Sequence, residues 1–241
     1  MEERARQFLY TLKCVVPLSR TMEKPFVCLV SEVSVDGKLT LARGVSSKIF
    51  MTLMDHEAKI FLHKLRAAHD AIMVGSNTIK IDNSNLTVRY VKGNNPIRVI
   101  PCSDGKIPLE SNVLNKEAKT IVAVSETARE DDINKLKGTG VKVIKCGSDR
   151  VNLNVLLNEL WKDGIKKMIL EGGPTLCHSM LKNKLIDEIK LIHIPVIVGG
   201  VDTPSLVWGD AAKTLNDVFN TKLKKFYLCG KNLITEYEVI Y

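Results

Sequence analysis

The chain has 241 residues, of which 45% are hydrophobic and 26% are charged, a balance typical of a folded globular protein and unlike a disordered one. Its formal net charge is +8, but the lysines are scattered and aromatic residues make up only 5%, which disfavours a nucleic-acid-binding surface. The positive charge is better suited to attracting a phosphorylated small molecule. No segment reaches membrane-spanning length, and the six cysteines contain no C-x-x-C pair, so we expect a cytoplasmic protein without a metal site.

Short runs rich in Val and Ile alternate with helical patterns along the chain. Residues 1–20 are too short and too charged for an export signal, and we treat residues 1–24 as an N-terminal extension that precedes a single domain over 25–241. The alternation predicts an α/β fold with a mainly parallel sheet, helices on both faces and a C-terminal antiparallel hairpin. In chain order the parallel strands are expected at Phe26–Val33, Ala71–Val74, Ile97–Ile100, Thr120–Val124, Val141–Ile144, Lys167–Leu170 and Glu188–Val198, and the hairpin strands at Lys224–Leu228 and Leu233–Ile240, joined around Cys229-Gly230-Lys231-Asn232.

The clearest helical pattern lies between the first two strands. Apolar residues from Met51 to Leu65 repeat at three and four residues and predict one continuous helix with a packed face. The basic residues His56, Lys59, His63 and Arg66 repeat in the same way on the opposite side, which we interpret as a solvated face. Of these, only Arg66 stands at the end of the helix that leads into the next strand, where a ligand is expected.

The strand Ala71–Val74 is followed by a turn with the features of an anion site. Gly75 ends the strand, and Ser76, Asn77 and Thr78 begin the next helix, where exposed N–H groups can hold a phosphate. Arg66 and Arg89 flank this segment, and arginine suits bidentate phosphate recognition.

The strand Lys167–Leu170 leads into a second such turn, Glu171-Gly172-Gly173-Pro174-Thr175-Leu176. Glycine lets a ligand approach the main chain closely, and proline is well tolerated in the first helical turn. The positive end of the helix dipole would favour a phosphate, and Glu171 stands at the carboxyl end of the strand, where open α/β sheets bind their ligands. For an isolated Gly-Gly-Pro, an ordinary strand-to-helix turn is the alternative interpretation.

Several common nucleotide and metal motifs are missing. Where a Rossmann dehydrogenase would carry G-x-G-x-x-G after its first strand, this chain has Ser34-Val35-Asp36-Gly37-Lys38. There is also no P-loop and no H-E-x-x-H. An ordinary Rossmann dehydrogenase is therefore disfavoured.

Six segments taken together carry a family resemblance. In order and spacing they resemble the pyrimidine reductases of riboflavin biosynthesis, which form the reductase half of the bacterial bifunctional deaminase/reductase and the stand-alone archaeal and fungal enzymes. The resemblance implies a dihydrofolate-reductase-like α/β fold, NADPH as hydride donor with NADH left open, a pyrimidine ribosyl phosphate as small-molecule substrate, and a homodimer. The segments are Ser34-x-Asp36-Gly37-Lys38, His63-x-Leu65-Arg66-Ala67, Asp70 to Thr78, Asp82 to Arg89, Glu171 to Leu176 and Pro195 to Gly200.

The resemblance also implies roles for single residues. Proton transfer at the sugar would fall to Lys38 and Glu171, while Asp36 shapes the turn before Gly37. The substrate would be bound by Ser47, Arg66, Leu86, Arg89 and Glu171. The cofactor would be bound by Gly75, Thr78, Asp82, Ser103, Gly172, Gly173, Pro174, Thr175 and Leu176.

The reaction implied is reduction of 2,5-diamino-6-ribosylamino-4(3H)-pyrimidinone 5′-phosphate to its ribitylamino form. The zinc deaminase signature is absent, because Pro101-Cys102-Ser103-Asp104 lacks the second cysteine, and a lone reductase remains. The Asp36-Gly37-Lys38 form resembles the archaeal type. The alternatives are reduction of the deaminated 5-amino-6-(5-phosphoribosylamino)uracil, a non-catalytic nucleotide-binding relative, and reduction of dihydrofolate, for which two arginines at a sugar phosphate would not be needed.

Overall fold

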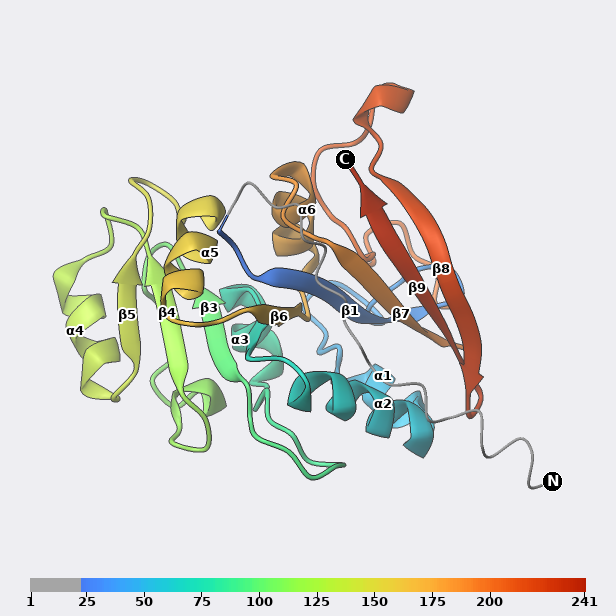
Figure 1. Ribbon diagram of the computed structural model, residues 1–241, viewed down its shortest axis with the longest axis horizontal. Coiled ribbons are helices and arrows are strands. Elements are labelled where there is room, and N and C mark those ends of the chain that lie inside the picture. Colours follow the sequence, from blue (N-terminus) through green and yellow to red (C-terminus); the bar gives the residue numbers. More distant parts are fainter. Residues whose placement is uncertain (1–22) are drawn as a thin grey trace.

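The computed structural model describes residues 23–241 and arranges them as one nine-stranded sheet with helices on both faces (Figure 1). The predicted extension, residues 1–24, therefore lies almost entirely outside the described residues. The elements are β1 (Phe26–Ser34), α1 (Lys48–Leu53), α2 (His56–Ala67), β2 (Ala71–Met73), α3 (Ser76–Asp82), β3 (Ile97–Pro101), the short 3-10 helix η2 (Asn112–Leu114), β4 (Thr120–Val124), α4 (Glu130–Gly138), β5 (Lys142–Lys145), α5 (Leu153–Lys162), β6 (Lys167–Leu170), α6 (Pro174–Lys182), β7 (Glu188–Ile194), η3 (Leu215–Asp217), β8 (Asn220–Cys229) and β9 (Asn232–Ile240).

The strand order is β5-β4-β3-β2-β6-β1-β7-β9-β8, with β5 at one end of the molecule and β8 at the other (Figure 1). The first seven strands in this order, which end with β7, run parallel to one another. Strand β9 pairs antiparallel with both β7 and β8. The β8–β9 loop is the two-residue turn Gly230-Lys231, with Gly230 at φ +62°, a conformation that glycine adopts without strain. The predicted mainly parallel sheet and terminal hairpin are confirmed.

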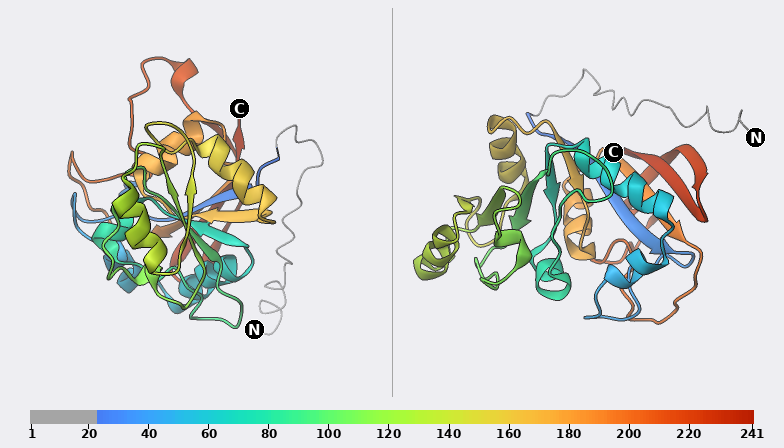
Figure 2. Two further views of the ribbon diagram at one scale, coloured as in Figure 1. Left: turned by 90° about the vertical axis from the view of Figure 1, so that its left-hand side faces the viewer. Right: turned by 90° about the horizontal axis from the view of Figure 1, so that it is seen from below.

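The two faces of the sheet bury two separate apolar cores. Successive side chains of β1 alternate between them, so that Cys28 and Val30 join one core while Val27 and Leu29 join the other. Helices α2, α3 and α4 contribute to the first core, and α5 and α6 to the second. Figure 2 shows α5 and α6 on the side of the sheet opposite α2. Both faces are therefore covered, as a parallel sheet requires.

The predicted helix from Met51 to Leu65 is interrupted, and the prediction of one continuous helix is wrong. α1 ends at Leu53, Met54 is extended, and α2 begins at His56 after Asp55 as its N-cap. The Asp55 N–H donates to the Asn232 side chain at 3.0 Å, and its carboxylate accepts from the backbone N–H of Lys231. The break is thus determined by the hairpin, which lies far away in sequence.

The last parallel strand is shorter than predicted, ending at Ile194 instead of Val198. Pro195 follows directly, and proline cannot donate a hydrogen bond to a sheet ladder. The segment after it instead contacts the turn that follows β1, where the Val35 N–H donates to the Val196 carbonyl at 2.8 Å. Among residues 23–241, no helix combines the length and apolar character needed to span a membrane.

Candidate active site

A pocket of about 1180 Å³ lies at the carboxyl ends of β1, β2, β3 and β6. Ligands of open α/β sheets bind at this edge. The loop of residues 39–47 and the segment 148–154 form much of the remaining wall. Eleven of the predicted site residues line the pocket: Ser47, Gly75, Thr78, Asp82, Ser103, Glu171, Gly172, Gly173, Pro174, Thr175 and Leu176.

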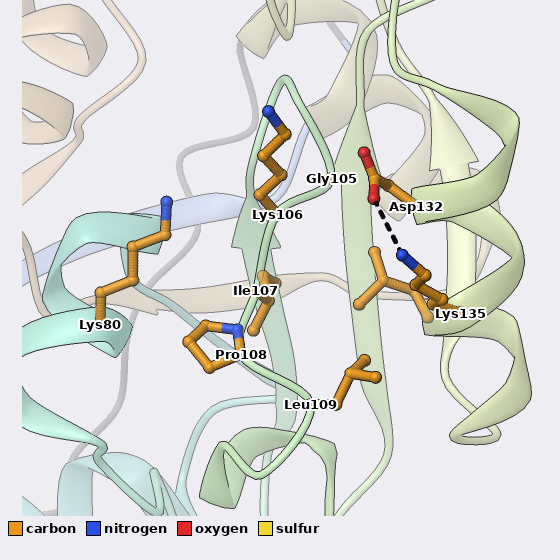
Figure 3. Close-up of a pocket in the computed structure, with 9 residues that line it drawn as sticks. Lys80, Gly105, Lys106, Ile107, Pro108, Leu109, Asp132 and Lys135 are labelled. Carbon is orange, nitrogen blue, oxygen red and sulfur yellow. Dashed lines mark ion pairs between the residues drawn. The ribbon is translucent and has the colours of Figure 1, made fainter.

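A smaller pocket of about 400 Å³ lies between α3, residues 105–109 and α4 (Figure 3). Its polar side chains include Lys80, Lys106 and the ion pair between Asp132 and Lys135, whose atoms are 3.8 Å apart. It contains none of the predicted site residues. The larger pocket is therefore the candidate active site.

The two predicted anion turns lie against each other in the pocket. The Gly75 N–H donates to the Gly172 carbonyl at 2.8 Å, which joins the end of β2 to the end of β6. A Cβ atom on Gly173 would lie 2.8 Å from the Thr78 Oγ1 atom, so only glycine fits there without movement. Pro174 begins α6, whose first three residues line the pocket. The fold therefore makes one continuous cradle from two segments about 100 residues apart.

Ser103 lies along the same cradle. Its hydroxyl accepts a hydrogen bond from the Val151 N–H at 3.1 Å, and its carbonyl accepts from the Ser125 N–H at 3.0 Å. These contacts hold the segment 148–154 beside the end of β3. The pocket thus extends from Glu171 across the α6 N-terminus to Ser103. A pocket of this extent has room for more than one ligand.

Arg66 and Glu171 form the strongest charged pair of the site. The Arg66 Nε and Nη2 atoms each donate to one Glu171 oxygen at 2.7 Å, and Nη1 donates to the Thr87 carbonyl at 3.1 Å. Only 7% of Arg66 is exposed. Burial lowers the pKa of Arg66, but the Glu171 carboxylate outweighs it and the pKa is raised, so the guanidinium stays charged. The pair joins the end of α2 to the end of β6 with the fork geometry that favours arginine.

Ser47 and Asp82 form a second pair, between a predicted substrate residue and a predicted cofactor residue. The Asp82 carboxylate accepts from the Ser47 hydroxyl at 2.6 Å and from the Ser47 N–H at 3.1 Å. Ser47 is the N-cap residue of α1, and Asp82 is the last residue of α3. This pair fastens the loop of residues 39–47 to the rim of the pocket.

Leu86 and Arg89 do not line the pocket, although both lie in the segment that Arg66 contacts. Leu86 is buried in the core with φ +54°. Arg89 is exposed, and its Nη1 atom is 3.4 Å from the Thr87 hydroxyl. Burial lowers the pKa of Arg89, and the positive charge of Arg66 lowers it further.

His63 holds the Arg89 backbone, and the prediction that His63 belongs to a solvated face is wrong. The His63 side chain is fully buried, and its Nδ1 atom accepts from the Arg89 N–H at 3.0 Å. Burial, together with the charges of Arg66 and Arg89, lowers the pKa of His63 to about 3. The imidazole is therefore neutral and available as an acceptor at ordinary pH.

Lys38 lies outside the pocket lining. Its ammonium donates to the Gly200 carbonyl at 3.0 Å and to the Thr203 carbonyl at 3.4 Å. Asp36 shapes the preceding turn as predicted, since it accepts from the Ser34 hydroxyl at 2.6 Å and from the Gly199 N–H at 2.7 Å. The Ser34 hydroxyl and the backbone donors of residues 198 and 199 lower the pKa of Asp36 to about 2.

Glu32 is a pocket residue that sequence reasoning missed. It stands on β1, on the same face as Cys28 and Val30, and it lines the pocket with Ser31. Burial raises the pKa of Glu32, and the Glu171 carboxylate acts in the same direction, bringing the pKa to about 7. The available signal was a lone carboxylate in a mostly apolar strand, at a position that shares a face with the buried residues Cys28 and Val30.

Fold and site together define an α/β ligand-binding domain with its pocket at the carboxyl ends of parallel strands. Within that class, the sequence pattern of the RibD C-terminal domain matches residues 25–235, and the chain belongs to this family. The resemblance drawn from the six segments is thereby confirmed.

Individual relatives agree with this assignment. Over 220 residues the chain is 50% identical to the "2,5-diamino-6-ribosylamino-4(3H)-pyrimidinone 5′-phosphate reductase" of Aquifex aeolicus, covering 91% of this chain and 98% of that protein. It is 39% identical over 219 residues to the protein of the same name from Methanothermobacter thermautotrophicus, covering 90% and 99%.

Solved structures share the fold. Acinetobacter baumannii RibD superposes with a TM-score of 0.77 at 24% identity, and the match covers 91% of this chain but 59% of that longer one. A pyrimidine reductase-like protein from Corynebacterium diphtheriae gives a TM-score of 0.73 at 23% identity, covering 94% of this chain and 96% of that one. At these identities the comparison concerns architecture, which agrees with the predicted fold class.

Proposed function

We propose that this protein reduces the ribosylamino group of 2,5-diamino-6-ribosylamino-4(3H)-pyrimidinone 5′-phosphate to the ribitylamino form in riboflavin biosynthesis. The observation that carries the proposal is the 50% identity to the Aquifex reductase along nearly the whole of both chains. The chemistry of the pocket supports it, because the charged pair of Arg66 and Glu171 lies next to the glycine turns of the proposed phosphate cradle. The enzyme is accordingly an oxidoreductase.

The cofactor class is a nicotinamide nucleotide, and NADPH is the proposed member. The cradle fits such a group, because the missing Cβ of Gly173 and the α6 N-terminus leave backbone N–H groups accessible to a pyrophosphate. Arg150 lines the pocket next to the segment held by Ser103, and an arginine suits the 2′-phosphate that distinguishes NADPH from NADH. When bound, the cofactor supplies a hydride. The proposed cofactor-binding residues are Gly75, Thr78, Asp82, Ser103 and Gly172 to Leu176.

The proposed substrate side consists of Ser47, Arg66, Leu86, Arg89 and Glu171. The two arginines of this set differ in how many of their N–H donors are still available to a ligand. Arg66 already uses three of its donors on Glu171 and Thr87, whereas Arg89 has one long contact with Thr87. Arg89 is therefore the better candidate for the 5′-phosphate, with Arg66 holding Glu171 in place. A proton-transfer role for Lys38 and Glu171 remains a prediction from the family resemblance.

Replacing Arg89 with Ala is expected to weaken substrate binding ~10- to 100-fold, the effect of losing a charge-assisted hydrogen bond to a phosphate. The NADPH dissociation constant should change by less than about twofold, since the cofactor cradle lies on other segments. Calorimetric titration of each ligand measures both. Lys92→Ala removes an exposed charge from the same loop and is the matched control. Equal losses of both affinities would contradict the proposed site map.

The proposed function is tested by supplying the purified protein with NADPH and the diamino substrate, with its deaminated uracil counterpart and with dihydrofolate, in parallel. We expect cofactor oxidation with the diamino compound. A preference for the uracil compound would instead assign the enzyme to the step after deamination. Cofactor binding without oxidation of any of the three would indicate a non-catalytic relative. Repeating the assay with NADH decides the cofactor.

We also propose a homodimer that pairs through β8, the edge strand of the sheet. The β-bulge between Leu223 and Lys225 brings Leu223, Phe226 and Leu228 onto one face of the strand. These side chains are 50%, 69% and 68% exposed, which is unusual for large apolar groups that lie together. A second copy of the same surface would cover them. Sedimentation at the mass of a monomer at micromolar concentration would contradict this proposal.

The division of the chain into an extension, 1–24, and a single reductase domain, 25–241, is likewise proposed, together with a cytoplasmic location. Support for one domain comes from the single sheet that joins β1 to β9. A chain that begins at residue 25 should then fold and retain activity.

A further inference from the structure

Three of the carboxylates that line the pocket, Glu32, Asp82 and Glu171, lie close enough to influence one another, and two of them already have strong partners. Glu171 is bound at both oxygens by Arg66, and Asp82 accepts two hydrogen bonds from Ser47. Among the described residues, the Glu32 carboxylate forms no ion pair. The only hydrogen bond that affects its pKa comes from its own backbone N–H. Glu32 is thus the carboxylate of the three that is free to act on a ligand.

Glu32 stands on a central strand of the sheet. β1 lies inside the sheet between β6 and β7, and Glu32 is paired in register with Ile192 of β7. Its side chain lies on the same face of the strand as Cys28 and Val30. Those two residues are buried in the core, whereas Glu32 lines the pocket. A side chain on a central strand is positioned more accurately than one on a loop.

The charged groups around Glu32 determine its proton affinity. The charges that act on the Glu32 carboxylate are Arg66 on α2, Asp82 on α3 and Glu171 at the end of β6. Its neighbour on β7 is the uncharged Ile192. Burial is the largest influence that raises the pKa of Glu32, the two carboxylates add to it, and Arg66 opposes it, so that the pKa is about 7. Near neutral pH the group is therefore able both to give and to regain a proton.

We propose that Glu32 is the general acid that opens the sugar ring of the ribosylamino substrate by protonating its ring oxygen O4′. This inference rests on the proposed function. The C1′–O4′ bond breaks, and its electron pair goes to O4′, which takes the Glu32 proton. At the same time the lone pair of the exocyclic nitrogen forms a C1′=N double bond. C1′ then accepts the hydride, and the π electrons return to nitrogen. Each turnover consumes one hydride and one proton, and Glu32 regains its proton from water.

The other two candidates for proton transfer are already engaged in strong contacts. Protonating Glu171 would break its paired hydrogen bonds and leave the buried Arg66 charge without compensation. The Lys38 ammonium is bound to the carbonyls of Gly200 and Thr203 outside the pocket lining. Both residues therefore serve as positioning groups, and Glu32 carries the proton.

The decisive measurement follows ring opening without reduction. The two anomers of the substrate interconvert through the ring-opened form, so NMR exchange spectroscopy reports this step directly. With oxidised cofactor present to complete the pocket, the wild-type protein should accelerate anomer exchange. Glu32→Gln, which keeps the shape of the side chain but cannot supply the proton, should abolish that acceleration. Dissociation constants for substrate and NADPH should stay within about threefold of wild type.

Turnover provides the second measurement. Glu32→Gln should lower kcat ~10²- to 10⁴-fold, the usual range for loss of a general acid. Wild-type kcat should fall as the pH rises through about 7, because the protonated form is the active one, and the variant should lack this decline. Glu32→Asp retains an acid and should recover part of kcat together with the decline. Glu238→Gln, an exposed change on β9, is the control and should match wild type.

Anomer exchange and kcat at wild-type levels in Glu32→Gln would overturn the assignment. A large loss of substrate affinity with unchanged kcat would also overturn it, since Glu32 would then only bind. A wild-type protein that neither binds nor reduces the diamino compound would refute the proposed function itself. Failure of the Glu32 assignment and failure of the proposed function are distinguishable, because the assignment is tested only in a protein that turns the substrate over.

Discussion

Replacing Arg66 with Met is expected to lower the free energy of unfolding by about 3–5 kcal/mol, the effect of leaving a buried charge without its partner. Glu171 would lose both of its 2.7 Å hydrogen bonds, and the Thr87 carbonyl would lose its donor. Turnover should fall on the order of 10²-fold or more, because the segment that carries Leu86 and Arg89 is no longer tied to β6. Urea denaturation and steady-state kinetics measure the two effects.

A double-mutant cycle separates the pair from its surroundings. The variant Arg66→Met/Glu171→Gln removes the stranded charge and should be more stable than Arg66→Met alone, with an interaction free energy of roughly 1–3 kcal/mol. Arg66→Lys keeps the charge but cannot donate to both oxygens in the fork geometry, so it should restore stability better than turnover. Additive effects of the two single changes would contradict a direct coupling between Arg66 and Glu171.

Replacing Arg98 with Met should lower the free energy of unfolding by about 3–5 kcal/mol, since several buried acceptors would lose their donor. Arg98 is fully buried, and it donates to the Asn85 carbonyl at 2.9 Å, to the Val113 carbonyl at 3.1 Å and to the Asn115 side chain at 3.0 Å. Since these contacts hold the segment that leads to Leu86, substrate affinity should fall as well. Chemical denaturation combined with substrate titration measures both.

The matched control is Arg129→Met. Arg129 pairs with Asp131 at 3.3 Å on the surface, where both side chains are more than 70% exposed. Such pairs contribute little, and the change should stay within about 0.5 kcal/mol. Similar stabilities for the Arg98 and Arg129 variants would show that the buried network around Arg98 is dispensable.

Much of the fold could be predicted because the relevant signals are local. Runs of Val and Ile separated by helical patterns indicate buried parallel strands, and each of the seven predicted runs coincides with a strand of the structure to within four residues at either end. The hairpin turn at Gly230-Lys231 was also visible, since a two-residue loop with glycine has few alternatives. The segments around Gly75 and Gly173 were identified by the same kind of local chemistry.

Other features depend on contacts between distant segments. The break at Asp55 requires Asn232, which is 177 residues away, and the burial of His63 requires the segment that carries Arg89. The helical period placed His63 on a basic face, but periodicity describes which side chains share a face and not what covers that face.

The sequence by itself determined the fold class, the two glycine turns, the order of the strands along the chain and the family, because strand and turn propensities and ordered motifs are written in neighbouring residues. Only the tertiary structure decided that Glu171 is held by Arg66, 105 residues away, that Ser47 meets Asp82 and that Glu32 has no ion-pair partner among residues 23–241. The physical reason is that the charge state and partners of a side chain depend on what is buried around it, and burial is a property of the packed chain.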